Sequence, residues 1–561
     1  MNFHPIDAKH GVLKEVFGYE TFRPGQEAAM DALLAGRNVL TVMPTGSGKS
    51  LCFQVPALVK SGLTLVVSPL VALMQDQVAA LRLAGVAADT INSAQTREAN
   101  VAAWRRAVAG ETRLLYLAPE RLMTERMLAA LTRLDVRLIA IDEAHCISQW
   151  GPSFRPEYES LARLRHDFPG VPIAALTATA DAATRADVCA KLFGGDAIEI
   201  VLGFDRPNIR LAVEPKRDGK VQLLRFLERH RGLSGIVYCL SRKKTETTAE
   251  MLVAHGIRAL PYHAGMDKEA REANQNRFMT EPAVVMVATI AFGMGIDKSD
   301  VRFVFHADLP GSMEAYYQEI GRAGRDGEPA EAHMLFGLGD IRMRRMFIDQ
   351  EEAGEDRRRR EHQRLNTLIG FCEAASCRRQ VLLGYFGETA EPCGNCDLCN
   401  EPGALVDATP LARLALEAVR QTGERYGAVH IANVLRGVSG EKIASTGHDR
   451  LSAFGSGAAL KTAQWQAILR QLVGGGFLAL DVAGYGGLTI SAKGHALLAG
   501  TETFRHRAEA PAAKTRKQAR QDVMAASTAN ADLLAALKEL RLRLAKQRRV
   551  PAYAIFPDRT L

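Results

Sequence analysis

The chain has 561 residues, 47% of them hydrophobic and 24% charged, which is material for three or four domains at roughly 150 residues each. No apolar run approaches the ~18 residues of a membrane span, and the first residues lack a signal peptide, so we expect a cytoplasmic protein without a membrane partner. The net charge of +8 favours a polyanionic partner, and nine cysteines are too few for a disulfide scaffold.

An aromatic residue, an arginine and a glutamine stand close together ahead of the first predicted strand. Tyr19 and Arg23 can stack on the two faces of a purine, while the amide of Gln26 offers a donor and an acceptor to the edge of adenine. Such a set would select ATP over GTP. The alternative is an aromatic staple beside a helix start that the glutamine caps.

A glycine-rich loop follows residues 38–42, an apolar run that we predict as a strand, and a helix can follow the loop. Its sequence from Met43 is Met-Pro-Thr-Gly-Ser-Gly-Lys-Ser, with Met43 in place of the first glycine that this motif usually has. The turn directs backbone N–H groups at one point, where phosphate oxygens can be held. Lys49 can reach the β and γ phosphates, and the Ser50 hydroxyl can bind Mg²⁺. The residues predicted to contact ATP here are Thr45, Gly46, Ser47, Gly48, Lys49 and Ser50.

A pair of acidic residues ends the apolar run 136–141, which is typical of a buried strand. Asp142 and Glu143 would be costly to bury without a cation or a proton to transfer. In a phosphoryl-transfer site Asp142 would hold Mg²⁺, and Glu143 would orient and deprotonate the attacking water. The alternative is a solvated loop end with two acids that have no such role.

Large aromatic side chains follow the acidic pair in a loop that also contains glycine and proline. Such residues are poor packing units in a loop, but a base stacked on an aromatic ring gains ~1 to 3 kcal/mol. We therefore predict Trp150, Phe154 and Arg155 as stacking platforms for the bases of a nucleic acid.

Alternating strands and helices predict two α/β units. In the first, strands at 63–67 and 114–117 lead into polar loops, which favours a parallel sheet whose loops gather at the carboxyl ends of the strands. The second unit begins near residue 204 and has no phosphate loop of its own. Its predicted strands are 235–239, 283–288 and 301–306.

The second unit carries the segment Gln318-Glu-Ile-Gly-Arg322-Ala-Gly-Arg325. Arginines three residues apart are expected to project from one side of a helix. Guanidinium groups inserted at a γ-phosphate raise the rate of phosphoryl transfer by ~10³ to 10⁵. ATP held by Lys49 in one unit and by Arg322 and Arg325 in the other would close the space between them, and hydrolysis would open it, as in a motor. The alternative is a surface helix with structural salt bridges.

Four cysteines occur in the pattern C-x15-C-x2-C-x2-C, which suits four thiolates around Zn²⁺. Four protein ligands leave no open position, so the zinc would be structural and its binding would fold the module. The predicted ligands are Cys377, Cys393, Cys396 and Cys399, with Cys372 as the competing choice for the first.

The motifs occur in the order found in superfamily 2 helicases, beginning with Phe-Arg-Pro-Gly-Gln at 22–26. Between residues 10 and 500 the chain resembles the bacterial RecQ DNA helicases, and the run 142–158 is close to a signature of that family. The resemblance implies an α/β fold of two RecA-like parallel-sheet lobes, followed by a helical zinc-binding module and a winged-helix domain. The implied bounds are 1–203, 204–336, 337–402 and 403–500, with a linker and an incomplete HRDC-like segment over 501–561.

The resemblance also implies a coupling between DNA contact and ATP hydrolysis. His145 and Gln149 would relay between the two through the aromatic loop, although Pro152 and Ser153 stand where relatives commonly carry His-Asp. The segment 176–179, Leu-Thr-Ala-Thr, would join the state of ATP to movement of the lobes, unless it is an ordinary helix cap.

Further positions take their roles from the same resemblance. Ser68 lies in a loop that would contact the backbone of a single DNA strand, and Gln318 would contact ATP. Cys377 stands in Cys-Arg-Arg-Gln as it does in RecQ relatives, which favours it over Cys372 as a zinc ligand.

Helices and a predicted hairpin follow the cysteines. Residues 477–482 and 488–490 would form the two strands of the wing, and Tyr485 at its tip could wedge a base pair of duplex DNA. Residues 501–530 have the composition of a linker, and leucines beyond it keep helical spacing. The segment 550–558, Val-Pro-Ala-Tyr-Ala-Ile-Phe-Pro-Asp, resembles the start of an HRDC domain. The chain ends at Leu561, too early to complete such a bundle, which predicts a truncated polypeptide or a partly unfolded segment.

We therefore expect an ATP-dependent DNA helicase that unwinds duplex DNA in recombination and repair, using ATP, Mg²⁺ and a structural Zn²⁺; its 3′-to-5′ polarity is implied by the resemblance. Its expected partners are single-stranded and duplex DNA and a single-stranded-DNA-binding protein, and we expect a monomer associated with the bacterial nucleoid. Two alternatives stay open. One is a DNA-stimulated ATPase that translocates or remodels DNA without efficient unwinding, and the other is a zinc and winged-helix DNA-binding scaffold with a silent ATPase.

Overall fold

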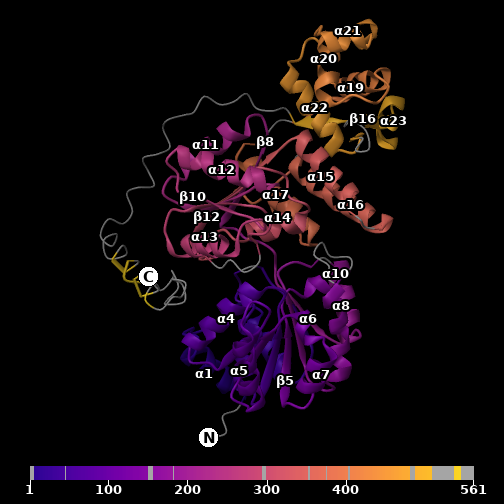
Figure 1. Cartoon of the computed structure of the whole chain (residues 1–561). Coiled ribbons are helices and arrows are strands. Elements are labelled where there is room, and N and C mark those ends of the chain that lie inside the picture. The colour runs from indigo at the N-terminus through magenta and orange to yellow at the C-terminus, as the bar shows by residue number, and fades with distance from the viewer. Residues whose placement is uncertain are drawn as a thin grey trace.

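The computed structural model describes residues 5–44, 46–148, 156–180, 182–293, 298–351, 354–374, 376–401, 405–480 and 487–507, with scattered positions between 536 and 547. Figure 1 shows two α/β lobes, one above the other, and a smaller, mainly helical domain on the side of the second lobe that faces away from the first. Within the described residues no helix is long and apolar enough to cross a membrane.

The first lobe is built on a sheet of seven parallel strands in the order β3-β4-β2-β5-β6-β1-β7. Every residue of β2 is buried, as is expected of a parallel strand that helices cover on both faces. At the sheet edge, β7 alternates half-buried and exposed residues. The strands are β1 Val39–Val42, β2 Leu63–Val67, β3 Ala88–Ile91, β4 Leu114–Leu117, β5 Val136–Ile141, β6 Ile173–Thr177 and β7 Ile198–Val201.

Helices cover both faces of this sheet. Apolar residues of α2, α3 and α4 pack on one face, and those of α5 and α7 pack on the other. The side chains of Thr96 and Thr124 cap α5 and α7 by accepting hydrogen bonds from the N–H groups three residues on. The helices are α1 Pro5–Glu15, α2 Gln26–Leu34, α3 Leu51–Val59, α4 Val71–Leu83, α5 Arg97–Val108, α6 Pro119–Leu122, α7 Glu125–Leu131, α8 Pro156–Glu159, α9 Leu164–Asp167 and α10 Ala182–Val188, with short turns η1 Ala144–Ile147, η2 Ser160–Arg163 and η3 Cys189–Phe193.

The second lobe has six parallel strands in the order β10-β11-β9-β12-β13-β8. Leu223 and Phe226 of α11 and Leu252 of α12 pack on one face of the sheet. The strands are β8 Ile209–Pro215, β9 Ser234–Tyr238, β10 Ala259–Tyr262, β11 Val285–Ala288, β12 Val301–His306 and β13 Ala330–Phe336. The helices are α11 Gly219–Arg229, α12 Arg242–Ala254, α13 Lys268–Thr280 and α14 Met313–Ile320.

A cysteine-bearing helical module and a winged helix follow the second lobe. A partly buried ion pair joins them, since Nε of Arg470 lies 2.6 Å from Oε1 of Glu373, at the end of α16. The module contains α15 Leu338–Gln350, α16 Glu355–Cys372, α17 Arg378–Tyr385 and α18 Asp397–Asn400. The winged helix contains α19 Thr409–Gln421, α20 Ala428–Arg436, α21 Glu441–Ser445, η4 His448–Arg450, α22 Thr462–Gly474, α23 Ala492–Ala499 and the antiparallel pairs β14 Leu405–Asp407 with β17 Arg505–Arg507 and β15 Leu478–Leu480 with β16 Leu488–Ile490.

Candidate functional site

The glycine-rich loop joins β1 to α3, as predicted. Gly46 and Gly48 have φ of +84° and +82°, a left-handed conformation that glycine adopts without strain. The ammonium group of Lys49 donates to the carbonyls of Met43 (3.0 Å) and Pro44 (3.2 Å), so the side chain folds back over the loop. Thr45 lies outside the described residues. This geometry leaves an ammonium at the centre of a turn whose N–H groups suit phosphate.

Two of the residues predicted to hold adenine contact the same loop. Arg23 is exposed and donates to the carbonyl of Gly46. The amide of Gln26 donates to the carbonyls of Ser47 (3.0 Å) and Gly48 (3.1 Å), and its oxygen accepts from the N–H of Arg23 (2.9 Å). The Gln26 amide is thus engaged within the protein here, and a contact to adenine requires it to exchange these bonds.

The two acids stand at the carboxyl end of β5, which β6 separates from β1 and the glycine-rich loop that follows it. Burial and the neighbouring Glu143 carboxylate raise the pKa of Asp142 to about 7, while the ammonium of Lys49 opposes that rise. Glu143 has a φ of +50°, an uncommon conformation for a residue with a side chain, and residues held in this way cluster at functional sites. A half-buried carboxylate with a raised pKa is one that a bound cation stabilises.

His145 lies beside Glu143 and is 99% buried. Its Nδ1 is 3.3 Å from Oε2 of Glu143 and 2.9 Å from the hydroxyl of Thr177. Burial alone would lower the pKa of His145, but Cys146 and Glu143 together raise it to about 10. Burial would likewise raise the pKa of Glu143, yet the hydrogen bond and charge of His145 hold it below its ordinary value. Each member of the pair therefore favours the charged form of the other.

A hydrogen bond crosses the boundary between the lobes at this point. The Gln318 amide of α14 donates to the hydroxyl of Thr179 (2.8 Å), and the N–H of Thr179 donates to the hydroxyl of Thr177 (3.2 Å). Thr177 in turn contacts His145. A continuous polar chain thus runs from Glu143 in the first lobe to α14 in the second, and Gln318 meets a threonine in this structure.

The two predicted arginines of the second lobe lie in a turn, and one of them is in contact with the first lobe. A β-carbon placed on Gly46 would stand 3.5 Å from Cγ of Arg325, so that side chain lies against the glycine-rich loop. The charge of Arg325 adds to burial in lowering the pKa of Lys49. Arg322 is buried and donates to the carbonyl of Gly293, and its charge acts on Glu143.

The expectation that both arginines project from a helix was wrong. Helix α14 ends at Ile320, and residues 321–326 form a series of turns. Gly324 has a φ of +56°, which breaks the helical path between the two arginines. The two side chains consequently lie differently: that of Arg325 lies against the glycine-rich loop, and the guanidinium of Arg322 is held at the carbonyl of Gly293 in the second lobe.

Most of the predicted DNA contacts fall outside the part of the chain that the structure describes. Gln149, Trp150, Phe154, Arg155 and Tyr485 are in this group. Ser68 is described and follows β2, but it is only 2% exposed. A buried hydroxyl is out of reach of a phosphate, so this placement gives the prediction for Ser68 no support.

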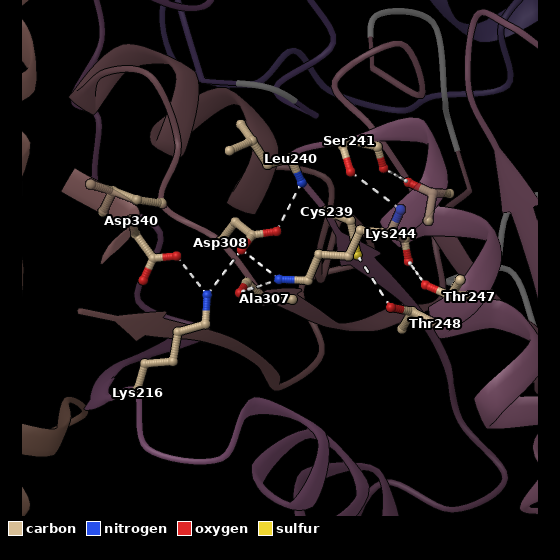
Figure 2. A network of polar contacts seen from close by, with 12 residues as sticks. Lys216, Cys239, Leu240, Ser241, Lys244, Thr247, Thr248, Ala307, Asp308 and Asp340 are labelled. Atoms are coloured by element: carbon tan, nitrogen blue, oxygen red, sulfur yellow. Dashed lines mark hydrogen bonds and ion pairs between the residues drawn. The ribbon is translucent and has the colours of Figure 1, made fainter. Parts of the chain in front are cut away.

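A second polar network, which sequence reasoning missed, lies at the carboxyl ends of strands in the second lobe, and Figure 2 shows it. Asp308, after β12, accepts from the ammonium groups of Lys216 (2.9 Å) and Lys244 (2.5 Å) and from the N–H of Leu240 (2.9 Å). Lys216 also donates to Asp340 of α15 (2.5 Å). Burial would raise the pKa of Asp308, but the two lysines hold it below its ordinary value. The network fixes the segment that enters α12, and an acid after the apolar run 301–306 was the signal for it.

The four predicted zinc ligands come together. The sulfur atoms of Cys377, Cys393, Cys396 and Cys399 all lie within 4.8 Å of one another, and Cys372 is buried elsewhere. Backbone N–H groups point at these sulfurs, from Cys393 to Cys377 (3.3 Å), from Asn395 to Cys393 (3.3 Å) and from Cys399 to Cys396 (3.4 Å). Such donors stabilise thiolates, so the residues fit a tetrahedral Zn²⁺ site with no open position.

Replacing Cys396 by serine is expected to remove the bound zinc and to unfold the module locally. Binding of a structural zinc contributes on the order of 10 kcal/mol to the folding of such modules, and three ligands hold it far less well. The measurements are the zinc content per chain and the rate of limited proteolysis. Cys372→Ala is the matched control, since Cys372 is equally buried and lies apart from the sulfur cluster; zinc retained at full occupancy in the Cys396→Ser chain would contradict the assignment.

Models of known protein families match almost the whole chain. The DEAD/DEAH box helicase model matches residues 23–188, and the helicase conserved C-terminal domain model matches 219–327. Together with the two parallel sheets and the glycine-rich loop against which Arg325 lies, these matches define a two-lobed helicase. Further matches are to the RecQ zinc-binding model over 338–400, the RQC domain over 402–515 and the HRDC domain over 530–561.

Relatives specify the family. The "ATP-dependent DNA helicase RecQ" of Haemophilus influenzae is 43% identical over 98% of this chain and 89% of the relative. That of Pasteurella multocida is 42% identical over 100% and 89%, and that of Bacillus subtilis is 37% identical over 98% and 91%. The chain belongs to the RecQ family of ATP-dependent DNA helicases. As a member it is an ATP-hydrolysing enzyme with a zinc-binding module. The family does not favour either alternative, the ATPase that remodels DNA without efficient unwinding or the scaffold with a silent ATPase.

Solved structures show the same fold at low sequence identity. The helicase Lhr of Mycobacterium smegmatis, bound to single-stranded DNA and AMP-PNP, has a TM-score of 0.51 at 21% identity and covers 88% of this chain and 61% of its own. Mss116p, bound to single-stranded RNA and AMP-PNP, has a TM-score of 0.51 at 16% identity and covers 66% and 82%.

Proposed function

We propose that the chain is a 3′-to-5′ DNA helicase that acts in recombination and repair, driven by ATP bound between its two lobes. The observation that supports this most directly is the contact of Arg325, in the second lobe, with Gly46 of the glycine-rich loop in the first. A γ-phosphate in that loop would lie between Lys49 and the guanidinium of Arg325.

The roles proposed for the site residues follow from this geometry. Lys49 and the loop N–H groups would bind the β and γ phosphates, while Ser50 and Asp142 would hold the Mg²⁺ that ATP brings. Glu143 would accept a hydrogen bond from the attacking water and orient it toward phosphorus. Arg325 would stabilise the charge that develops on the γ-phosphate, and Arg322 would support it near Glu143. Tyr19, Arg23 and Gln26 would hold the base.

Stepping requires that hydrolysis change how the lobes meet. Loss of the γ-phosphate would remove the bridge from Lys49 to Arg325, so that the lobes separate. We propose that the chain Glu143, His145, Thr177, Thr179 and Gln318 reports this change across the boundary, because its last hydrogen bond joins the two lobes. Gln149 would extend the same relay toward the DNA.

The DNA contacts and partners complete the proposal. Trp150, Phe154 and Arg155 would stack on bases of the tracking strand, and the winged helix, with Tyr485, would meet duplex DNA at the junction. The net charge of +8 suits such a partner. We infer that the protein acts as a monomer in the bacterial nucleoid and that it binds a single-stranded-DNA-binding protein there.

Strand displacement with tailed substrates tests the proposal. With ATP and Mg²⁺, unwinding of a duplex with a 3′ single-stranded tail is expected to exceed that of the same duplex with a 5′ tail by at least about tenfold, since a motor that moves in one direction loads productively on one tail. Lys49→Ala should abolish both. Equal unwinding of the two tails would contradict the polarity, and ATP turnover without displacement of either strand would revive the remodelling ATPase.

A further inference from the structure

The segment that connects the two lobes lies against the turn that carries the arginines. We call residues 204–208 the interlobe linker and residues 321–327 the arginine turn. The guanidinium of Arg206 in the linker donates to three carbonyls of the turn, those of Gly321 (3.3 Å), Ala323 (3.0 Å) and Gly324 (2.9 Å). One planar side chain therefore spans the backbone between Arg322 and Arg325.

A second linker residue holds the same turn. The amide of Asn208 donates to the carbonyls of Gly324 (2.8 Å) and Glu328 (2.9 Å). Gly324 has a φ of +56°, and a β-carbon there would stand 2.4 Å from the Asn208 amide nitrogen. The arginine turn thus packs closely against the interlobe linker. Hydrogen bonds from the linker side chains fix the directions of its carbonyl groups.

The cysteine-bearing module holds the linker itself. Arg379, two residues after the first zinc ligand, is buried and donates to Asp205 (2.7 Å) and to the carbonyl of Ile209 (2.6 Å), one on each side of Arg206. The N–H of Phe204 donates to Glu388 (2.7 Å), and its ring stacks on Phe386 at 4.3 Å. Arg206 therefore projects from a segment that is anchored on both sides.

We propose that Arg206 is the positioning residue for the arginine turn, and that its anchored linker sets where Arg325 meets the γ-phosphate. This inference rests on the proposed role of Arg325. Arg206 makes no contact with ATP in this scheme: three carbonyl contacts decide the path of the turn, and the path decides where the Arg325 guanidinium points.

The test separates positioning from binding. Arg206→Ala is expected to lower kcat for ATP hydrolysis in saturating single-stranded DNA by about 10- to 100-fold, because displacing a catalytic group by about 1 Å costs that much. The dissociation constants for a fluorescent ATP analogue and for single-stranded DNA should not change. Arg206→Lys should recover only part of kcat, since one ammonium cannot hold three carbonyls in a plane. Full recovery by lysine, or ATP affinity that falls in step with kcat, would overturn the proposal.

Controls separate this inference from the role of Arg325. Arg210→Ala removes a half-exposed ion pair with Glu331 on the adjoining strand and should leave kcat unchanged. Asn208 holds the same turn through one amide, so Asn208→Ala should lower kcat by a smaller factor and leave binding unchanged. This variant serves as the test if Arg206→Ala does not fold. In an Arg325→Ala background Arg206→Ala should lower kcat by a smaller factor than it does in the parent chain, and a fully additive loss would refute positioning. If Arg325→Ala hydrolyses ATP at the full rate, the proposed role of Arg325 is wrong. If Arg325→Ala is inactive while Arg206→Ala is fully active, the role of Arg325 stands and only the positioning role of Arg206 is refuted.

Discussion

Arg325→Ala is expected to lower DNA-stimulated ATP turnover by about 10³-fold or more while ATP still binds. The magnitude follows from arginine fingers in phosphoryl transfer, whose removal costs ~10³ to 10⁵ in rate. The side chain lies against Gly46, and its charge acts on Lys49, so in the proposed ATP complex it would lie at the γ-phosphate. Binding should persist, because Lys49 and the loop N–H groups remain. Steady-state turnover and the affinity for a fluorescent ATP analogue are the two measurements.

Two further variants sharpen that result. Arg325→Lys keeps the positive charge but loses the planar fork, so it should recover little of the turnover. Arg258→Ala removes an exposed arginine of the same lobe that pairs with Glu281, and it should behave as the parent chain. If Arg325→Ala hydrolyses ATP at the parent rate, Arg325 takes no part in the chemistry.

Glu143→Gln is expected to lower ATP turnover by about 10²- to 10⁴-fold, the range that a positioned acid or base contributes. Glutamine keeps the shape of the side chain but cannot accept a proton. The lowered pKa of Glu143 beside His145 keeps its carboxylate ionised. A carboxylate with a lowered pKa is also a weak base, so orientation of the attacking water accounts for much of the effect. Single-turnover hydrolysis, with ATP binding measured separately, gives the readout.

The neighbouring acid provides the contrast. Asp142→Asn should weaken the binding of Mg²⁺ and ATP as well as turnover, because Asp142 is the half-buried carboxylate whose pKa is raised to about 7 and which a cation would stabilise. Glu143→Gln should leave that binding intact and should trap the closed state with DNA bound. Loss of ATP binding in both variants to the same degree would show that the two acids are not divided between metal and water.

Local chemistry made much of the fold predictable. The strands expected at 63–67, 114–117, 136–141 and 301–306 are β2, β4, β5 and β12, because continuous apolar runs between polar loops have few other ways to be buried. β3 was missed, since Asp89 interrupts its apolar character. Only the folded chain supplies Arg82, Arg106 and Thr112 around that carboxylate and makes its burial tolerable.

By itself, the sequence determined which chemistry the chain carries: glycines that can turn, a lysine and two acids at strand ends, and four cysteines at zinc spacing each depend on residue type and on a few neighbours. The tertiary structure alone decided the partners across long separations. Gln318 contacts Thr179, Ser68 is buried, the two arginines leave a turn in different directions, and Arg206 holds that turn. Contacts between residues 115 to 139 positions apart depend on how two lobes pack, and local propensity carries no information about that packing.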